Sequence, residues 1–416
     1  KHQACPYCGF TAPKIKEYVT KEITHSALTT QKCIIKYRAR RYKCSCCGKT
    51  YYEFNPFVFK SQKISILTVH NILKDLKDFN ETFTSVARRY HVSPTSVSTI
   101  FDKHVDIGRN PLPEIINFDE VYAFKSEKSK YVCVLLDFKK QIPVDVLPNR
   151  KKEYLLNYFQ KIPLEERKKV KYACSDMYEV YRDVVHKVFP SCCMLLDYFH
   201  LSQDFHRKMN EVRIKVMKGY KDNKASDEYY LLKKFNWLLF KNPEDEDKYG
   251  RLFDVERERK YNSHFKSYMN YYDLRKKLLE INNDLTICYS LKLELVDFYS
   301  KSTIDNAKVN LENLIRSCID TNIDEMIAFS NNLINWKQEI INSFTIVGTE
   351  YKVEADKGQV VVCNKKVNNA IIENRNKIVK CIKNNANGYT NWSRFRNRVM
   401  YVLDPNATFS LEPREK

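Results

Sequence analysis

The most regular pattern in the chain lies between residues 115 and 176, where short apolar runs end at turn residues. Three of these runs follow one another, at Ile115–Glu120, Tyr131–Asp137 and Ile142–Leu147. Their length and their content of branched and aromatic side chains predict three consecutive β-strands. A helical pattern near Lys152–Phe159 separates them from a fourth apolar run, Lys171–Asp176, so we expect a helix and then a fourth strand.

The chain continues in the same alternating way beyond the fourth run. Met177–Val188 has a helical pattern, Cys192–Asp197 is a fifth apolar run, and a basic helix is predicted from Leu201 onward. Three strands that can pair antiparallel, followed by helix, strand, helix and strand, have the order of an RNase-H-like sheet. In such a sheet the ends of the first and fourth strands lie side by side. We therefore expect Asp119 and Asp176 to be neighbours.

The stretch from residue 220 to residue 351 has a helical pattern with few Gly or Pro residues. This pattern predicts an all-helical insertion between two parts of the sheet domain. Two pairs of residues within it have the spacing of helix capping boxes, namely Ser302 with Asp305 and Thr321 with Asp324.

The segment Asn364–Met400 carries a third acid of interest on a helical pattern, which the turn Asn387-Gly388-Tyr389 is expected to end. Glu373 lies on this helix, and Lys380 follows about two turns later on the same side. Beyond Asp404 the sequence has the composition of a flexible tail.

Residues 62–106 also have the period of α-helices. Phe83–Tyr90 is followed by a short break and then by a second helical segment that has Pro94 near its start. This arrangement predicts a helix-turn-helix, although an ordinary pair of packed helices has the same pattern. In a DNA-binding helix-turn-helix, the residues at the start of the recognition helix that we expect to face DNA are Thr95, Ser96 and Ser98.

Length, charge and cysteine content limit the classes of protein to which this sequence can belong. The 416 residues suffice for two to four domains, and a formal net charge of +20 favours a polyanion as partner. The 14 cysteines are dispersed, unlike the framework of a small disulfide-rich secreted protein. No apolar run approaches the roughly 18 residues of a membrane span, and the first residues have no signal peptide pattern, so we expect a cytoplasmic protein without a membrane partner.

Two cysteine pairs near the N-terminus have the spacing of a metal site. Each CxxC pair is followed by a glycine that can take the tight turn behind the second sulfur, and the four cysteines are Cys5, Cys8, Cys44 and Cys47. Four thiolates around one Zn²⁺ leave no open position for a substrate. We therefore expect the zinc to stabilise a small zinc ribbon rather than to act in catalysis.

A basic run lies just before the second cysteine pair. Arginines alternate with tyrosines over residues 36–43, which suits a hairpin that contacts phosphates, although a solvated charged face has the same composition. The candidates for phosphate contact are Arg38, Arg40 and Arg41.

Three acids are candidates for a catalytic metal site: Asp119, Asp176 and Glu373. Hard divalent ions such as Mg²⁺ prefer carboxylate oxygens, and two ions roughly 3.5 to 4 Å apart stabilise the entering and leaving oxygens of a phosphoryl displacement. An acid at a strand end is more often a turn or cap residue. Periodicity alone does not choose among the candidates and their rivals, which are Glu120, Asp137, Asp145 and Asp197.

Resemblance to a known family distinguishes the three candidate acids from their rivals. Residues 113–205 and 364–400 resemble the DDE transposases of bacterial insertion sequences, in particular the ISL-three family, whose members begin with a zinc ribbon and a helix-turn-helix. Asn117-Phe118-Asp119-Glu120-Val121 resembles the motif of the first acid, which implies that Asp119 is catalytic. Ser175-Asp176-Met177-Tyr178 resembles the motif of the second acid and implies that Asp176 is a metal ligand. Asp197-Tyr198-Phe199-His200 matches a nearby signature whose Asp and His are candidates to support the ligands.

The motif of the third acid departs from the family pattern. The family usually has Gly and Pro before its Glu, where this chain has Asn368-Asn369-Ala370-Ile371-Ile372 before Glu373. The residues after Glu373 match the family spacing better. By this resemblance, the basic residues expected to contact DNA are Lys377, Lys380 and Arg396.

The resemblance implies a DNA transposase with a structural Zn²⁺ and with two Mg²⁺ or Mn²⁺ ions at the three acids. Such an enzyme binds the terminal inverted repeats of an insertion sequence, cleaves a strand with water, and joins the freed 3′ hydroxyl to target DNA. Its partners are the double-stranded DNA of the transposon ends and the target, and a second copy of the chain. A homodimer is expected because two ends are joined in one complex, which would be associated with the nucleoid in the cytoplasm.

Two other functions fit parts of the sequence. A domesticated, sequence-specific DNA-binding regulator would keep the fold without the reaction, and the altered residues before Glu373 motivate it. A nuclease specific for branched DNA would share the catalytic fold, but it has little use for the N-terminal domains that read sequence.

The fold class that we expect is therefore α/β and multidomain. An RNase-H-like catalytic domain with an all-helical insertion is preceded by a zinc ribbon and a helix-turn-helix. The expected boundaries are 1–60 for the zinc ribbon, 61–108 for the helix-turn-helix, 109–218 and 352–404 for the two parts of the catalytic domain, 219–351 for the insertion, and 405–416 for the tail.

Overall fold

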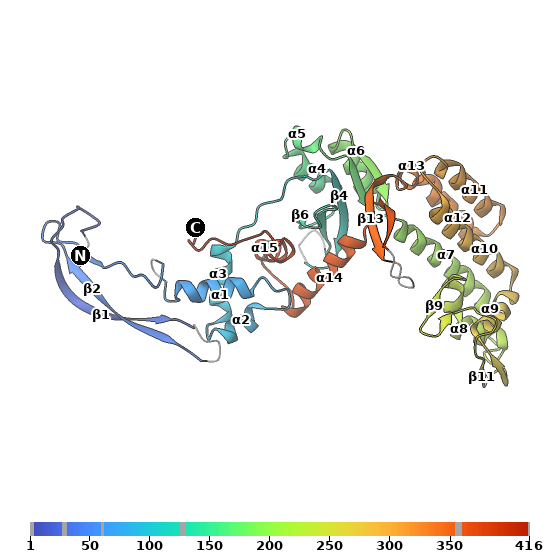
Figure 1. Cartoon of the computed structure of the whole chain (residues 1–416), viewed down its shortest axis with the longest axis horizontal. Coiled ribbons are helices and arrows are strands. Elements are labelled where there is room, and N and C mark those ends of the chain that lie inside the picture. Colours follow the sequence, from blue (N-terminus) through green and yellow to red (C-terminus); the bar gives the residue numbers. More distant parts are fainter. Residues whose placement is uncertain (1–3, 27–30, 60–61, 125–129, 354–359, 415–416) are drawn as a thin grey trace. The chain divides into compact units, whose positions relative to one another are not determined.

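The computed structural model of the chain describes residues 4–26, 31–59, 62–124, 130–353 and 360–414 (Figure 1). Its internal contacts divide it into two compact units. The first unit consists of Lys1–Pro113, Asp119–Leu155 and Ile371–Lys416. The second unit consists of Glu114–Phe118 and Leu156–Ala370, so the division passes through a single strand.

That strand belongs to a five-stranded mixed sheet. In sheet order the strands are β6 (Pro143–Leu147), β5 (Val132–Asp137), β4 (Ile115–Val121), β7 (Tyr172–Ser175) and β8 (Cys193–Leu196). β5 and β6 pair antiparallel, whereas β7 is parallel to both β4 and β8. All residues of β5 and β6 are buried, which explains their nearly continuous apolar sequences. The five strands predicted from the sequence are confirmed.

Two helices of the first unit cover this part of the sheet. They are α14 (Ala370–Asn385) and α15 (Trp392–Leu403), joined by a turn in which Asn387 and Gly388 have φ of 54° and 99°. Their apolar faces pack against β5 and β6 in one core that includes Val134, Val146, Val379, Phe395 and Val399. The predicted helix with Glu373 and the turn that ends it are therefore confirmed.

Three helices of the first unit form the predicted helix-turn-helix region. They are α1 (Ile66–Asp75), α2 (Phe83–Arg89) and α3 (Pro94–His104), around a buried core that also contains Tyr401 of α15. The Ser93 side chain caps α3 by accepting from the backbone N–H of Ser96. The buried Arg398 of α15 donates to the carbonyls of Asp78 and Glu81 (2.9 and 2.8 Å). These contacts fix the three helices against α15.

The C-terminal tail is ordered where the structure describes it, so the expected flexibility is wrong. The backbone N–H of Ser410 donates to the carbonyl of His104 (3.0 Å), and Arg414 donates to the carbonyls of Asp102 and Val105 (2.9 and 2.8 Å). Phe409 packs against the core of the helix-turn-helix. Most tail residues are polar, and several of their contacts are with backbone carbonyls, which a sequence pattern does not reveal.

The N-terminal part of the first unit is a long antiparallel sheet. β1 (Lys14–Thr24) and β2 (Ile34–Lys43) form the extended, curved pair seen in Figure 1, and β3 (Thr50–Tyr52) pairs with the end of β2. Its buried cluster is small and consists of Cys5, Tyr42, Cys44 and Tyr51.

The second unit consists mainly of helices around a separate apolar core. The helices near the sheet are α4 (Lys152–Gln160), which starts in the first unit, α5 (Leu164–Arg167) and α6 (Glu179–Val188). The others are α7 (Tyr198–Lys218), α8 (Asp227–Lys234), α9 (Tyr271–Glu280), α10 (Asn283–Lys301), α11 (Ala307–Asp320), α12 (Asp324–Asn335) and α13 (Lys337–Asn342). The long α7 packs against α10 and α12, and Trp336 is buried in the same core.

The insertion is not all-helical, which corrects the sequence prediction. Short strands form two hairpins, β9 (Glu246–Asp247) with β10 (Gly250–Arg251) and β11 (Lys260–Asn262) with β12 (Ser267–Met269). A third hairpin joins β13 (Ile346–Val353) to β14 (Val360–Lys366). The strands of the first two hairpins have two or three residues each, too few to show a period of two.

The proposed capping boxes are also wrong. Ser302 ends α10, and Thr321 ends α11 by donating to the carbonyl of Cys318 (2.8 Å). The following helices begin after Asn306 and Ile323, neither of which makes a side-chain cap.

Candidate functional site

Asp119 lies on β4 in the first unit and is 8% exposed. Both of its carboxylate oxygens accept hydrogen bonds. Oδ1 accepts from the backbone N–H of Glu120 (2.7 Å), and Oδ2 accepts from the side-chain amide of Asn376 (2.8 Å). A carboxylate held at both oxygens in this way has a defined orientation, as a metal ligand requires.

The amide that holds Asp119 belongs to the helix that carries the third acid. Asn376 lies three residues after Glu373 on α14, and side chains at this spacing share a helix face. Asn376 is 4% exposed, and its Oδ1 has no hydrogen-bond partner among the residues that the structure describes. The first unit therefore brings the Glu373 face of α14 to Asp119.

Asp176 belongs to the second unit and directly follows β7. β7 runs parallel to the first residues of β4, with Asn117 opposite Cys174. Ser175 donates from its hydroxyl to the carbonyl of Asp176 (2.8 Å), and the N–H of Tyr178 donates to the same carbonyl (2.8 Å). These bonds fix the backbone at the half-buried Asp176.

Asparagines tie the segment before α14 to β4 within the second unit. Asn117 donates from its amide to the carbonyl of Asn368 (2.8 Å) and to Oδ1 of Asn369 (2.7 Å). The N–H of Asn369 in turn donates to Oδ1 of Asp197 (3.3 Å). All of these side chains except that of Asn368 are buried. The two asparagines that stand near the family's Gly and Pro positions thus make specific contacts of their own.

Three of the rival acids have other partners. Glu120 pairs with Arg150, and Asp145 pairs with Arg396 (Nε to Oδ1, 2.7 Å). Oδ1 of Asp137 accepts from two backbone N–H groups in the turn after β5. These contacts give each acid a structural role. Asp197, the fourth rival, is 3% exposed, and its Oδ2 lies 3.9 Å from Nε2 of His200.

Arg396, one of the predicted DNA contacts, is the ion-pair partner of Asp145. Arg396 also donates to the carbonyl of Ile107 (2.7 Å), so its guanidinium is used inside the first unit. In contrast, Lys377 and Lys380 are exposed on α14.

The four predicted cysteines come together near the N-terminus. Their sulfurs all lie within 4.8 Å of one another, and the Sγ atoms of Cys5 and Cys47 and of Cys8 and Cys44 are 3.7 and 3.5 Å apart. Tetrahedral Zn²⁺ with Zn–S bonds of about 2.3 Å requires sulfurs roughly 3.8 Å apart, so the group fits one metal ion.

The backbone around these cysteines is also that of a metal site. Gly9 and Gly48 have positive φ, and their N–H groups donate to the carbonyls of Cys5 and Cys44 (2.9 and 3.0 Å). Hydrogen bonding from the Cys47 backbone lowers the pKa of the Cys44 thiol to about 7, which favours the thiolate form that binds metals.

The three arginines of the N-terminal sheet that we predicted to contact DNA differ in whether they form ion pairs within the chain. Arg38 is exposed and stacks over the ring of Tyr18 at 4.6 Å. Arg40 pairs with Glu53 (3.0 Å), and Arg41 pairs with Glu17 (2.7 Å). Pairs this exposed contribute little to stability, so phosphates can compete for both arginines.

The three hydroxyl residues of α3 that we predicted to face DNA differ in their exposure and in their hydrogen bonds. Thr95 is exposed at the first turn of α3. Ser96 is bonded to Ser93 (2.8 Å) and Ser98 to the carbonyl of Pro94 (2.7 Å).

Sequence reasoning missed the roles of Asn117, Asn369 and Asn376. The signal for Asn376 was its spacing of three residues from Glu373 on a predicted helix. The partner of an amide depends on which strand the helix meets, and a single sequence does not contain that information.

Comparisons with known proteins agree with this geometry. A family model described as a transposase, that of the ISL-three group, matches residues 116–355, which include Asp119 and Asp176 and end before Glu373. A transposase for the insertion sequence element IS1001 from Bordetella parapertussis is 19% identical over 409 residues, covering 98% of this chain and 90% of that protein. Among the described residues, helices that are both long and apolar enough to span a bilayer are absent.

Proposed function

This chain belongs to the ISL-three family of transposases, and from that premise we propose that it binds the terminal inverted repeats of an insertion sequence and catalyses strand cleavage and strand transfer. The substrates are the double-stranded DNA of the element ends and of the target. The protein acts as a homodimer, because two ends must be joined in one complex.

Asp119, Asp176 and Glu373 are the proposed catalytic acids. The observation that carries this assignment is the hydrogen bond from Asn376 to Asp119, because Asn376 lies one turn after Glu373 on α14. The register of β4 and β7 supports the inclusion of Asp176. Asn117 lies opposite Cys174, and a step of two residues along each chain leads to Asp119 and to Asp176. A sheet order of β6-β5-β4-β7-β8 supports an RNase-H-like catalytic domain.

The three carboxylates fit Mg²⁺ or Mn²⁺, since both ions prefer oxygen ligands and Asp119 is already oriented by two donors. Two such ions would stabilise the charge on the attacking and leaving oxygens of an in-line displacement.

The chain's own residues position the DNA and the acids. Asn376 holds Asp119, and the exposed Lys377 and Lys380 on the same helix contact phosphates near the scissile bond. In the first step water attacks phosphorus and the 3′ oxygen leaves as a hydroxyl. In the second step that hydroxyl attacks a target phosphorus and displaces the target's own 3′ oxygen. Neither step needs a covalent bond to the protein.

The N-terminal domains supply sequence recognition. We assign Zn²⁺ to the Cys5, Cys8, Cys44 and Cys47 site, where it stabilises the ribbon. The exposed Arg38 of the ribbon contacts phosphates, with Arg40 and Arg41 beside it. Thr95 at the start of α3 faces the bases, with Ser96 and Ser98 on the same helix.

The test is cleavage of element-end DNA by the full-length protein with Mg²⁺. Asp119→Asn, Asp176→Asn and Glu373→Gln should each lower the cleavage rate by about 100-fold or more, because each removes a charged metal ligand. Glu120→Gln is the matched control, since Glu120 adjoins Asp119 but pairs with Arg150. Cleavage that survives the three substitutions would exclude the assignment.

A DNA-binding regulator without catalysis is the second candidate function. It is favoured by Ala370 and Ile371, which stand where the family usually has Gly and Pro before Glu373. Specific binding to the element ends without cleavage under Mg²⁺ or Mn²⁺ would establish the regulator in place of the transposase.

A further inference from the structure

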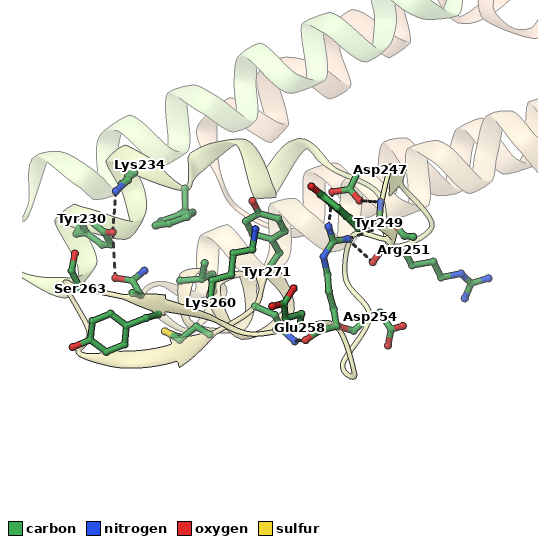
Figure 2. A pocket seen from close by; sticks show the side chains of 18 residues that line it. Tyr230, Lys234, Asp247, Tyr249, Arg251, Asp254, Glu258, Lys260, Ser263 and Tyr271 are labelled. Carbon is green, nitrogen blue, oxygen red and sulfur yellow. Dashed lines mark hydrogen bonds and ion pairs between the residues drawn. The ribbon is translucent and has the colours of Figure 1, made fainter.

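The helical insertion contains a cavity of about 640 Å³ that the proposed catalysis does not use. Its walls are the hairpins β9–β10 and β11–β12 and the helices α8 and α9, all within the second unit (Figure 2). A volume of this size lies within the range of sites that bind small organic groups.

Tyrosine and lysine side chains face this cavity. Tyr249 lies at the tip of the β9–β10 hairpin, beside Gly250 at φ 96°, and is 68% exposed. Lys248 and Lys260 approach its ring at 4.7 and 5.9 Å from the centroid. Figure 2 shows Tyr249 and Lys260, from the two different hairpins, both directed toward Tyr271. An exposed aromatic ring with cations beside it is suited to stacking on a nucleobase.

The floor of the cavity is apolar. Met269 and Leu274 are buried, and the rings of Tyr230 and Phe235 line the same side. This floor would contact the face or edge of a flat ring system.

Hydrogen bonds join the two hairpins that form the cavity wall to the loop between them. Arg257 donates to Oδ2 of Asp247 (2.6 Å) and to the carbonyl of Arg251 (3.0 Å), which ties the loop after β10 to the first hairpin. The buried Asn270 donates from its amide to the carbonyls of Val255 and Arg257 (3.1 and 3.2 Å). These bonds hold the backbone of the loop that joins the two hairpins.

Three carboxylates line the cavity; Asp247 is paired with Arg257, and the other two favour a nucleobase over a bare phosphate. Asp254 and Glu258 line the cavity together with Lys234, Arg251 and Lys260. A carboxylate inside the cavity repels a phosphate but accepts the N–H groups of a base. The cations can neutralise a phosphate that remains at the rim.

We propose that this cavity binds an unpaired nucleotide of the DNA on which the protein acts. The base stacks on the exposed ring of Tyr249, with its N–H groups toward Asp254 and Glu258 and its phosphate toward Lys260. A paired base inside a duplex cannot enter a concave site, so the ligand is a single-stranded or extruded nucleotide. This inference rests on the proposed function, since it takes DNA as the partner.

The experiment measures binding of the full-length protein to a fluorescent single-stranded oligonucleotide and to a duplex of unrelated sequence, without divalent ions. Tyr249→Ala should weaken single-strand binding by about tenfold and leave duplex binding nearly unchanged, because it removes one stacking contact. Tyr249→Phe should bind like the unaltered protein because it keeps the ring.

Tyr268→Ala is the matched control for the ring. Tyr268 is also 68% exposed and lies on the neighbouring hairpin, but it does not line the cavity. For the cation, Lys260→Ala should weaken single-strand binding and Lys266→Ala should not, although both change one lysine of the same hairpin.

The outcomes separate this inference from the proposed function. Equal single-strand binding by Tyr249→Ala and Tyr268→Ala would overturn the nucleotide site, even if the protein cleaves element ends. Equal weakening of duplex and single-strand binding would also overturn it and indicate a general phosphate contact. Loss of single-strand binding in Tyr249→Ala with no cleavage by the unaltered protein would support the site and contradict the transposase reaction.

Discussion

At the scale of single residues, the amide of Asn376 links the first acid to the helix of the third. It occupies Oδ2 of Asp119, while the N–H of Glu120 occupies Oδ1. Each carboxylate oxygen has further lone pairs, so these bonds orient Asp119 without blocking a metal ion. Outer partners of this kind commonly affect metal affinity as well as rate.

Asn376→Ala should lower Mg²⁺-dependent cleavage by about 10- to 100-fold and raise the Mg²⁺ concentration needed for half-maximal rate, because Asp119 loses its orientation. The rate is measured against Mg²⁺ concentration with element-end DNA. Asn384→Ala is the control, since Asn384 is exposed near the end of the same helix. An unchanged Mg²⁺ dependence in Asn376→Ala would mean that the amide serves stability alone.

At the scale of elements, the proposed zinc ribbon has very little apolar core. Its buried cluster is four residues, two of which are the cysteines themselves. Such a small cluster cannot offset the entropy of ordering a long hairpin, so metal binding must provide much of the folding free energy.

Chelation of zinc, or Cys8→Ser, should therefore remove hydrogen-exchange protection from β1, β2 and β3. The helices α1 to α3 should keep theirs, because they have an apolar core of their own. Exchange is followed by mass spectrometry on the full chain, with zinc content measured beside it. Protection of the three strands that persists in metal-free protein would contradict the assignment.

The docking of the tail on α3 should depend on pH. Burial lowers the pKa of His104, whose Nδ1–H donates to the carbonyl of Ser410 (2.7 Å). A histidine with a lowered folded pKa stabilises the fold above its unfolded pKa of about 6.5, and this contribution is lost as pH falls through the folded value.

Protection of the amides in residues 407–414 should accordingly fall as the pH is lowered below about 6.5, after correction for intrinsic exchange rates. His104→Gln should show a smaller change over the same range because glutamine does not titrate. A pH dependence that is identical in the two proteins would assign it to other groups.

Sequence patterns were sufficient to predict the long helices and strands but not the short strands. The strands β4 to β8 and the helix with Glu373 were predicted because buried runs and helical stripes extend over four residues or more. The hairpins around Tyr249 were missed because their strands have two or three residues and one turn uses Lys266 at φ 50°. The three acids were separated from their rivals by resemblance, and the partners of Glu120, Asp137 and Asp145 became visible only with tertiary contacts.

At the scale of the whole molecule, the net charge of +20 favours a polyanionic partner, and the proposed DNA binding should weaken with salt. Each arginine that neutralises a phosphate contributes about 0.9 to the slope of log K against log salt concentration. The ion pairs of the structure determine which arginines take part.

Arg38→Gln should lower that salt slope by about 0.9, because Arg38 is exposed and stacks only on Tyr18 among the contacts described. Arg396→Gln should leave the slope unchanged and lower the melting temperature instead, because Arg396 pairs with the buried Asp145. The slope is obtained from binding isotherms on element-end DNA at several salt concentrations. Equal slopes for Arg38→Gln and the unaltered protein would exclude Arg38 from the interface.

The central proposal is that Asp119, Asp176 and Glu373 hold the metal ions of a DNA-cleaving site. Its most direct test is the cleavage rate of Asp119→Cys and of Asp176→Cys with Mg²⁺ and with Mn²⁺. Thiolate is a poor ligand for Mg²⁺ and a better one for softer ions, so both variants should be inactive with Mg²⁺ and recover cleavage with Mn²⁺. Activity of either variant with Mg²⁺, or failure of Mn²⁺ to restore any cleavage, would contradict metal binding at that residue.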